Sequence, residues 1–335
     1  MSLGIFPFVY FFSFPALFKA QNYKHKRGIH AIYICGLLIC VILWLAFIIC
    51  VGVIFLVDAR VFGDVSLIVN IAGNHEYPGI WDSVYYFKPS NYPNITDWEL
   101  RKLILFFDYE KRHGRETTID CETNDVIQAV NHALANPDLF LSAKKPDIIT
   151  ECTACRQKGC LTDYLCHGTE IKNAKLIFKC GKLLSAVKAR NKSAQELAEE
   201  PRAASKDPLD YFDYIMMSWG NCIACDSLVM ERMLGRFPNE HDFSVGFKPG
   251  VRFYFKYNII ENHKDFANDG MHPAKVKDEL ILSDYLHCCI IPENHKPEFE
   301  NIIPLILMDR VFYIKNDCAD IWDWTEKVYD CVCKK

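Results

Sequence analysis

The chain has 335 residues, of which 50% are hydrophobic and 24% charged, with 16 cysteines and a formal net charge of -4. This composition excludes an intrinsically disordered chain and a collagen-like repeat, and the slightly acidic balance argues against a nucleic-acid partner. The length suffices for one large domain or two small ones.

The charges are distributed unevenly along the chain. The first acidic residue is Asp58, and residues 58–335 carry -8, which is the total of -4 less the charge of the first 28 residues. Four cations give those 28 residues their charge of +4: Lys19, Lys24, Lys26 and Arg27.

Residues 29–57 form an uninterrupted apolar stretch without Asp, Glu, Lys or Arg. Because about 20 apolar residues of helix cross a bilayer, we predict a single transmembrane helix over 29–57, with the lipid bilayer as a partner. A buried core helix is the alternative, but such helices seldom run this long without a polar face. The positive-inside rule then makes 1–28 a short basic cytosolic tail and 58–335 a lumenal or extracellular domain, at the plasma membrane or a secretory-pathway membrane. Residues 4–18, which are apolar and contain two prolines, are expected to insert at the membrane or to be cleaved.

Thirteen cysteines follow the apolar stretch, and an oxidising lumen predicts a disulfide framework among them. Their number is odd, so one is free or links two chains in a disulfide-bonded homodimer. Zinc is an alternative, because Cys152-x2-Cys155 and Cys222-x2-Cys225 are two-residue knuckles, but 66 residues separate them, against about 15–20 in a zinc ribbon. A thioredoxin-like redox motif at Cys222 is a third alternative. We predict no metal and no cofactor. The disulfide candidates are Cys121, Cys152, Cys155, Cys160, Cys166, Cys180, Cys222, Cys225, Cys288, Cys289, Cys318, Cys331 and Cys333.

Periodicity and turn residues predict an α+β class for residues 58–335, which makes the expected fold a disulfide-stabilised α+β ectodomain on a single transmembrane helix. A linker or exposed loop over 192–208 marks a subdivision. In chain order the predicted elements are a strand in 64–73, a helix capped at Thr96 and ending near His113, a helix from Asn124 stopped by Pro137, a loop over 152–166, a polar helix in 171–199, helices in 211–219 and 227–234, a strand in 251–257 paired with 243–247, strands in 302–308 and 311–314, and a helix in 320–328.

No catalytic signature stands out, since the chain lacks H-E-x-x-H, G-x-S-x-G, a P-loop, a dinucleotide glycine fingerprint and a strict D-x-D. Two acidic sets recur every third residue: Asp207, Asp210 and Asp213, and Asp317, Asp320 and Asp323. On a helix each set would share a face, which suits binding of a cation or a basic partner, or simply a solvated helix start. A general base could lie among the histidines of the last hundred residues, His241, His263, His272, His287 and His295. The weak catalytic candidates are Asp210, Asp213, His241 and Asp320.

Two functions fit these features. The first is a type II-like membrane glycoprotein whose cysteine-rich domain binds an unidentified extracellular or lumenal ligand, with N-glycosylation at the sequons of Asn94 and Asn191. The alternative is a membrane-anchored lumenal or ecto-enzyme, a transferase or hydrolase with its active site in 207–324. The sequence leaves open whether the chain is an enzyme.

Overall fold

The computed structural model describes residues 41–45, 67–75, 79–81, 83–150, 159–200, 208–244 and 246–335. The chain divides into two compact units, Met1–Gly63 and Asp64–Lys335. In the first unit the structure describes one helical turn, residues 41–45, whose side chains are exposed.

The predicted membrane anchor requires a correction. Among the described residues, no helix has the length and apolar character needed to cross a membrane. The structure therefore does not support the single-span topology, the membrane localisation or the type II glycoprotein function that rested on it. Apart from 41–45, the predicted span 29–57 lies outside the described residues, as do the tail 1–28 and its apolar segment 4–18.

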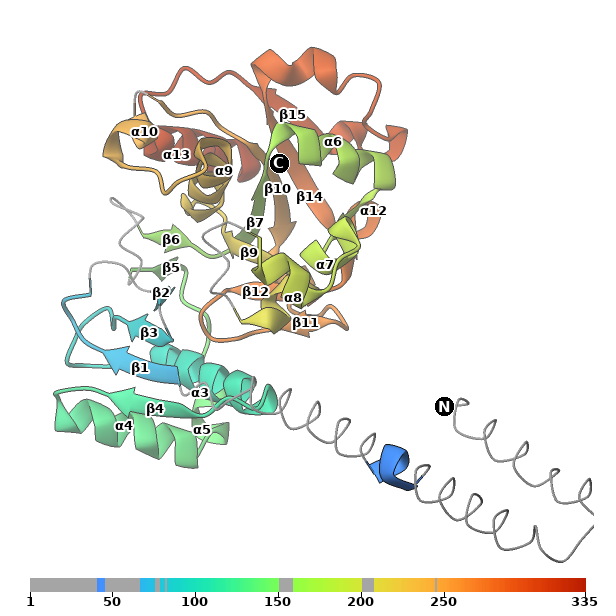
Figure 1. Cartoon of the computed structure of the whole chain (residues 1–335). Coiled ribbons are helices and arrows are strands. Elements are labelled where there is room, and N and C mark those ends of the chain that lie inside the picture. The colour runs from blue at the N-terminus through green and yellow to red at the C-terminus, as the bar shows by residue number, and fades with distance from the viewer. Residues whose placement is uncertain are drawn as a thin grey trace, which may run out of the picture. The chain divides into compact units, whose positions relative to one another are not determined.

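The second unit begins with a four-stranded sheet in the order β2-β3-β1-β4 (Figure 1). Strand β1 is parallel to β3 and β4, whereas β2 is antiparallel to β3. Alternate residues of β1 are buried, and they pack with two helices, α3 and α4, in one apolar core. The elements are β1 (Leu67–Ile71), β2 (Gly79–Trp81), β3 (Val84–Phe87), α3 (Asp97–Arg112), β4 (Thr117–Asp120), α4 (Asn124–Ala135) and α5 (Asp138–Leu141).

The rest of the unit is built on a seven-stranded sheet in the order β11-β12-β9-β7-β10-β14-β15, with two small sheets, β13-β8 and β5-β6. Its neighbours are antiparallel except β14 and β15, which run parallel. The strands are β5 (Ile148–Ile149), β6 (Cys160–Leu161), β7 (Tyr164–Thr169), β8 (Lys182–Leu184), β9 (Tyr214–Trp219), β10 (Val251–Lys256), β11 (Phe266–Ala267), β12 (Ala274–Lys277), β13 (Glu279–Ile281), β14 (Leu286–Pro292) and β15 (Val311–Ile314). The helices are α6 (Ile171–Cys180), α7 (Ala186–Arg190), α8 (Ala194–Ala198), η3 (Leu209–Asp213), α9 (Ala224–Leu234), α10 (Glu240–Ser244), α11 (Tyr257–Ile260), α12 (Leu282–Tyr285), η4 (Glu293–Glu298), η5 (Leu305–Arg310) and α13 (Ile321–Val332).

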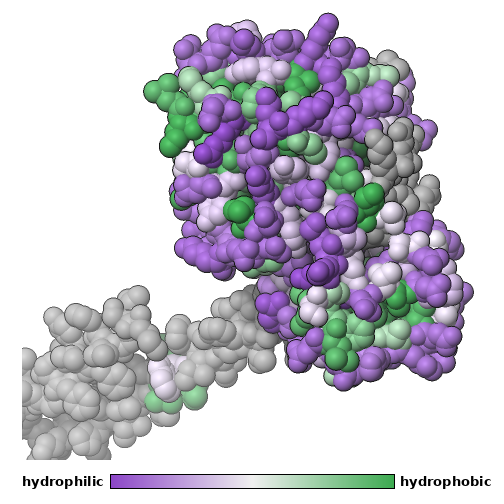
Figure 2. Space-filling model, turned by 180° about the vertical axis from the view of Figure 1, so that it is seen from behind, coloured by the Kyte–Doolittle hydropathy of each residue, from purple (hydrophilic) through white to green (hydrophobic). Residues whose placement is uncertain are grey.

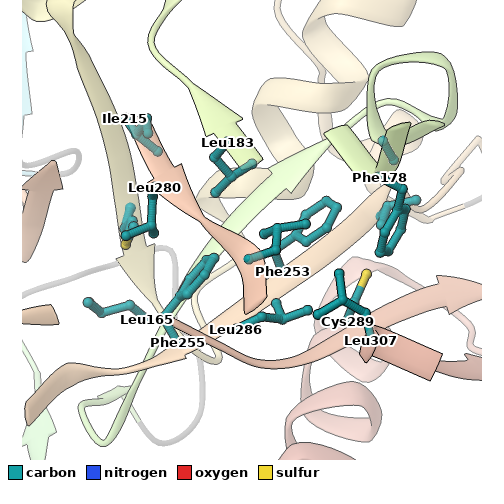
Figure 3. Close-up of a cluster of buried hydrophobic side chains, with 14 of the residues drawn as sticks. Leu165, Phe178, Leu183, Ile215, Phe253, Phe255, Leu280, Leu286, Cys289 and Leu307 are labelled. Atoms are coloured by element: carbon teal, nitrogen blue, oxygen red, sulfur yellow. The ribbon is translucent and has the colours of Figure 1, made fainter. Parts of the chain in front are cut away.

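Both faces of this sheet are covered, which explains the nearly continuous apolar run of β10. On one face Phe253 and Phe255 pack with Phe178 of α6, in the core drawn in Figure 3. On the other face Tyr254 packs in a second core with helices α9 and α13, which contributes Trp324. The face drawn in Figure 2 is mostly hydrophilic, with a few separate apolar patches.

Several predicted elements are confirmed. Helix α3 begins at the expected cap, where Thr96 and Glu99 form a capping box, and α4 ends before Pro137. The strand in 251–257 and the helices in 227–234 and 320–328 are present as β10, α9 and α13.

Other predictions are wrong because a short apolar run is compatible with more than one element. The predicted helix in 211–219 is the 3-10 turn η3 followed by strand β9, and the predicted strand in 302–308 is replaced by η5. The polar helix in 171–199 is broken at Gly181, a left-handed residue (φ 72°), into α6, β8, α7 and α8. Strand β10 pairs with β7 and β14 rather than with 243–247. The subdivision over 192–208 stays a prediction, since residues 201–207 lie outside the described ones.

The predicted disulfide framework is also wrong: the structure has an α/β fold, and none of its described cysteines forms a disulfide bond. The sulfurs of Cys166 and Cys225 are 3.5 Å apart, whereas a disulfide bond is about 2.05 Å long. Most of these side chains fill apolar cores as small hydrophobic residues. Cys152 and Cys155 lie outside the described residues, and in the part described no group of three or more His, Cys, Asp or Glu could hold a metal ion. The described cysteines are Cys121, Cys160, Cys166, Cys180, Cys222, Cys225, Cys288, Cys289, Cys318, Cys331 and Cys333.

Candidate functional site

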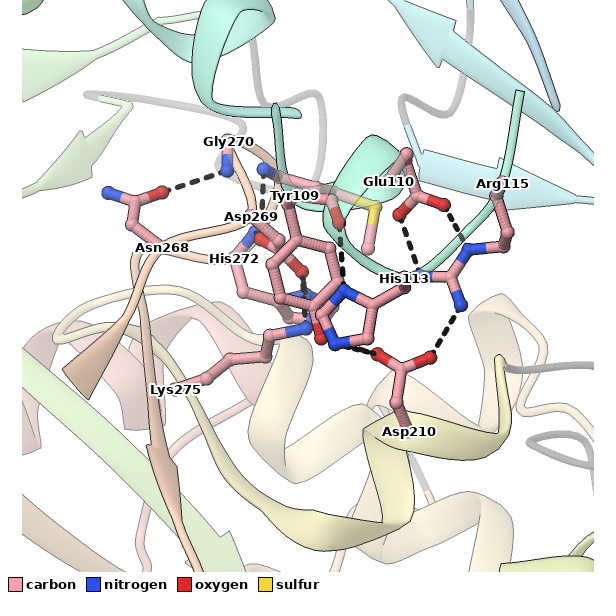
Figure 4. A network of polar contacts seen from close by, with 11 residues as sticks. Tyr109, Glu110, His113, Arg115, Asp210, Asn268, Asp269, Gly270, His272 and Lys275 are labelled. Carbon is pink, nitrogen blue, oxygen red and sulfur yellow. Dashed lines mark hydrogen bonds and ion pairs between the residues drawn. The ribbon is translucent and has the colours of Figure 1, made fainter. Parts of the chain in front are cut away.

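Three segments that are distant in the sequence bring ionisable side chains together at the C-terminal end of α3 (Figure 4). Helix α3 and the residues after it supply Tyr109, Glu110, His113 and Arg115, and η3 supplies Asp210. The loop before β12 supplies Asp269 and His272, and the start of strand β12 supplies Lys275. A cluster of this kind is a candidate for a functional site because catalytic groups commonly come from separate elements and sit in unusual electrostatic surroundings.

The loop 268–272 is shaped by side chains that bind its own backbone. The Oδ1 atom of Asn268 accepts a hydrogen bond from the amide of Gly270 at 2.8 Å. The Oδ1 atom of Asp269 accepts hydrogen bonds from the amides of Met271 and His272 at 3.1 and 2.6 Å. Such Asx turns follow from short side chains that reach the amide two residues later. They leave the second carboxylate oxygen of Asp269 available for a side chain.

Gly270 lets this loop lie directly on α3. Its φ is 71°, in the left-handed region, and a Cβ atom on it would be 1.9 Å from the carbonyl oxygen of Lys102. A residue with a side chain would therefore push the loop away from the helix. The position of Asp269 and His272 beside α3 depends on this glycine.

Asp269 and His272 form a carboxylate–imidazole pair. Oδ2 of Asp269 lies 2.9 Å from Nδ1 of His272. The carboxylate is completely buried, whereas the imidazole side chain keeps 26% of its surface exposed. Within the described part of the chain, Nε2 of His272 has no hydrogen-bond partner. The pair thus fixes the ring on one side and leaves its other nitrogen available to a substrate.

Lys275 completes the buried part of the site. Its ammonium group is 2.9 Å from Oδ2 of Asp269, and the residue is fully buried. The same ammonium lies 3.6 and 4.0 Å from the ring centroids of Tyr211 and Tyr109, within the range of cation–π attraction. The ring centroid of Tyr214 is 5.1 Å away, so the buried charge is compensated by one carboxylate and by aromatic faces.

The pKa values of Asp269 and Lys275 are both lowered, which favours the charged form of Asp269 and the neutral form of Lys275. Burial alone would raise the pKa of Asp269, but His272 and Lys275 outweigh it, and the pKa lies far below the usual value for a carboxyl group. Burial lowers the pKa of Lys275, and the charge of Asp269 opposes that shift only in part. Asp269 therefore remains ionised, and an ionised Asp269 keeps the proton of His272 on Nδ1.

Asp210 forms a second set of contacts that joins η3 to α3. It accepts hydrogen bonds from the hydroxyl of Tyr109 and from Arg115, whose Nη1 atom is 2.6 Å away, and it lies 3.6 Å from Nε2 of His113. Arg115 also pairs with the fully buried Glu110. Burial would raise the pKa of Asp210, but the hydrogen bonds from Arg115 and Tyr109 lower it more. These contacts hold η3 against the C-terminal end of α3.

The four weak catalytic candidates from the sequence do not form one site. Asp210 belongs to the cluster, and Asp213 ends the same 3-10 turn, with burial raising the pKa of its carboxyl group. Asp320 caps α13 by accepting hydrogen bonds from the amides of Trp322 and Asp323, which is a structural use of the residue. His241 lies in α10, where its backbone carbonyl oxygen accepts hydrogen bonds from the hydroxyl group of Ser244 and the amide of Gly246.

Two other predictions concern the surface. Asn94 and Asn191 are both exposed, so glycosylation at either residue stays a prediction. Asp207 lies outside the described residues.

Sequence reasoning missed most of the cluster. Of its members, only Asp210 and, within a group of five histidines, His272 were candidates. Tyr109, Glu110, Arg115, Asp269 and Lys275 carried no motif. A local signal existed in Asn268-Asp-Gly-Met-His272, where a turn-forming triplet places a carboxylate three residues before a histidine.

Comparison of the chain with known proteins gives no relative to interpret this cluster: no protein-family model, curated protein or solved structure matches it.

Proposed function

We propose that the chain is an enzyme that uses general acid–base catalysis, with His272 as the base. The observation that carries the proposal is the pairing of a fully buried Asp269 with a partly exposed His272 at 2.9 Å, which leaves Nε2 free within the described residues. A base held by a third group in this way is the arrangement on which many proton-abstracting sites depend.

The roles follow from the contacts. His272 and Lys275 keep Asp269 ionised against the effect of burial, and Asp269 in turn orients the imidazole. Lys275 and Asp269 therefore both act as positioning residues. Nε2 of His272 then takes a proton from a water molecule or a substrate hydroxyl group, which becomes the nucleophile. A hydrolysis or group transfer is the reaction class that such a base serves.

The contacts of Asp210 favour a structural role for the other half of the cluster. Tyr109, Arg115 and His113 all converge on this carboxylate, which links α3 to η3 over 95 or more residues of sequence. We infer that this half of the cluster is mainly a structural junction. Mutation of His272 should therefore lower activity, whereas mutation of Asp210 should mainly lower stability.

The experiment compares wild type with His272→Gln, and His132→Gln serves as the control because His132 is exposed on α4. Each purified chain is incubated with a small-molecule cell extract, and the compounds consumed are identified by mass spectrometry. We expect compounds that wild type and H132Q consume and that H272Q consumes about 10²–10⁴ times more slowly, the usual contribution of a general base. Equal consumption by wild type and H272Q, or consumption by neither, would refute the proposal.

A second measurement does not depend on knowing the substrate. Nitrogen-15 chemical shifts of the His272 ring should show the neutral ring protonated at Nδ1, because Asp269 accepts that proton. In Asp269→Asn the preference for this tautomer should weaken. A ring protonated at Nε2 in wild type contradicts the assigned role.

A further inference from the structure

Two thiols face each other between β7 and α9, in the core on the opposite face of the sheet from α6. The sulfur atoms of Cys166 and Cys225 are 3.5 Å apart although 59 positions separate the residues. Cys166 is fully buried, and Cys225 retains 8% of its surface exposed. Cys225 is therefore the less deeply buried member of the pair.

The backbone brings the pair together through a glycine. Gly168 lies two residues after Cys166, and a Cβ atom on it would be 2.7 Å from Cβ of Cys225. Any other residue at this position would move α9 away from β7. The close approach of the two sulfurs thus rests on the absence of a side chain at Gly168.

A buried cation lies in the same core. Arg252 of β10 pairs with Asp226, the residue after Cys225, through a 2.7 Å hydrogen bond from Nε, and it also donates to Thr325 of α13 at 2.7 Å. The positive charge of Arg252 favours an ionised sulfur nearby.

The two thiols differ in acidity. The hydrogen bond from Cys166 lowers the pKa of Cys225, and the charge of Arg252 acts in the same direction against burial. Burial raises the pKa of Cys166, so its proton stays on its own sulfur. Cys225 is therefore suited to act as the attacking thiolate, and Cys166 as the thiol that then forms the disulfide bond.

We propose that Cys166 and Cys225 are a reversible dithiol–disulfide couple that is oxidised by hydroperoxides. The Cys225 sulfur attacks the O–O bond of the peroxide, an S–O bond forms, and the alcohol or water leaves, which gives a sulfenic acid. The Cys166 sulfur then attacks this sulfur, the S–S bond forms and water leaves with the thiol proton. Two thiols thereby lose two electrons and two protons, and the peroxide is reduced.

The couple is distinct from the disulfide framework that the structure excludes, because both residues are reduced in the structure. Bond formation needs the sulfurs to move about 1.5 Å closer, to the length of a disulfide bond. Cys288 and Cys289 provide a contrast in the same fold. They are consecutive on β14 and belong to opposite cores, and burial raises the pKa of both.

The test treats the full chain with hydrogen peroxide, alkylates the remaining thiols under denaturing conditions, and identifies cross-linked peptides by mass spectrometry. We expect a peptide pair joined through Cys166 and Cys225 that disappears after dithiothreitol. Cys225→Ser should abolish the cross-link and leave Cys166 open to alkylation, whereas Cys289→Ser should keep it.

Wild type alone also decides the matter, should Cys225→Ser fail to fold. The proposal is overturned if peroxide oxidises the exposed Cys180 and Cys333 while Cys166 and Cys225 are both recovered alkylated. It is equally overturned if the cross-link forms but resists dithiothreitol in the folded chain. The unfolding midpoint should rise on oxidation, because the bond closes a long loop in the unfolded state; an unchanged midpoint in a chain that carries the cross-link contradicts the geometry described above.

Discussion

Replacing Gly270 by alanine tests whether the contact of loop 268–272 with α3 holds the candidate site in place. The added Cβ atom would lie 1.9 Å from the carbonyl oxygen of Lys102 and 2.9 Å from the amide nitrogen of Phe106. Both neighbours are helix backbone, so neither can rotate away as a side chain would. The loop itself must therefore shift.

Two costs add in this variant. An L-residue in the left-handed region costs roughly 1–2 kcal/mol, and overpacking a close contact costs about 1–3 kcal/mol more. We expect Gly270→Ala to lower the free energy of unfolding by about 2–5 kcal/mol. The assay is urea unfolding at pH 7, followed by circular dichroism and fitted to a two-state transition.

Gly181→Ala is the matched control. Gly181 has almost the same φ, 72°, but a Cβ atom on it would meet nothing within 4 Å. This variant should lose only the backbone cost of roughly 1–2 kcal/mol. If the two variants differ by less than about 0.5 kcal/mol, the spread of ordinary surface substitutions, the argument from close contact is refuted.

Two further predictions concern buried charges. For Asp269→Asn, the free energy of unfolding should depend less on pH below about pH 4 than it does in wild type. Wild-type Asp269 has a lowered pKa in the folded state, so at acid pH it takes up its proton only on unfolding. The stability that the ionised Asp269 contributes is present above the pKa of the unfolded chain and is lost as the pH falls, at up to about 1.4 kcal/mol per pH unit. Equal acid slopes for the two chains in urea titrations would contradict the assignment. Arg252→Met should cost about 3–5 kcal/mol because it leaves the fully buried Asp226 without its cation, and Arg252→Met/Asp226→Leu should regain much of that loss. A double variant no more stable in urea than Arg252→Met would show that the pair is not coupled.

Secondary structure was predictable where the signal is short and local. The capping box of Thr96 and Glu99 marks the start of α3, and Asp320 begins α13. Residues 214–219 gave the opposite result, since their apolar run suits a helix and a strand equally. They are a strand because β7 and β12 lie on either side of them and supply the backbone partners.

The candidate site was predictable only in fragments. Asp210 attracted attention as a member of a regular acidic series, yet its contacts are with Tyr109 and Arg115, about a hundred positions earlier. Lys275 appeared as one of many lysines, and its unusual state follows from burial among aromatic rings of two other elements. No local pattern encodes such neighbours, because they are chosen by the packing of whole elements.

The cysteines show the same division. Their number and spacing suggested cross-links, but a bond requires two sulfurs about 2 Å apart with suitable Cβ positions. The sequence by itself determined the composition, the segregation of charge, the helix caps and the turn residues, because each depends on residues a few positions apart. Only the tertiary structure decided which carboxylate forms a hydrogen bond with His272, which lysine is buried and which two thiols lie next to each other. Those outcomes depend on distances between elements, and these distances are set by how apolar faces pack and by where a glycine permits close approach.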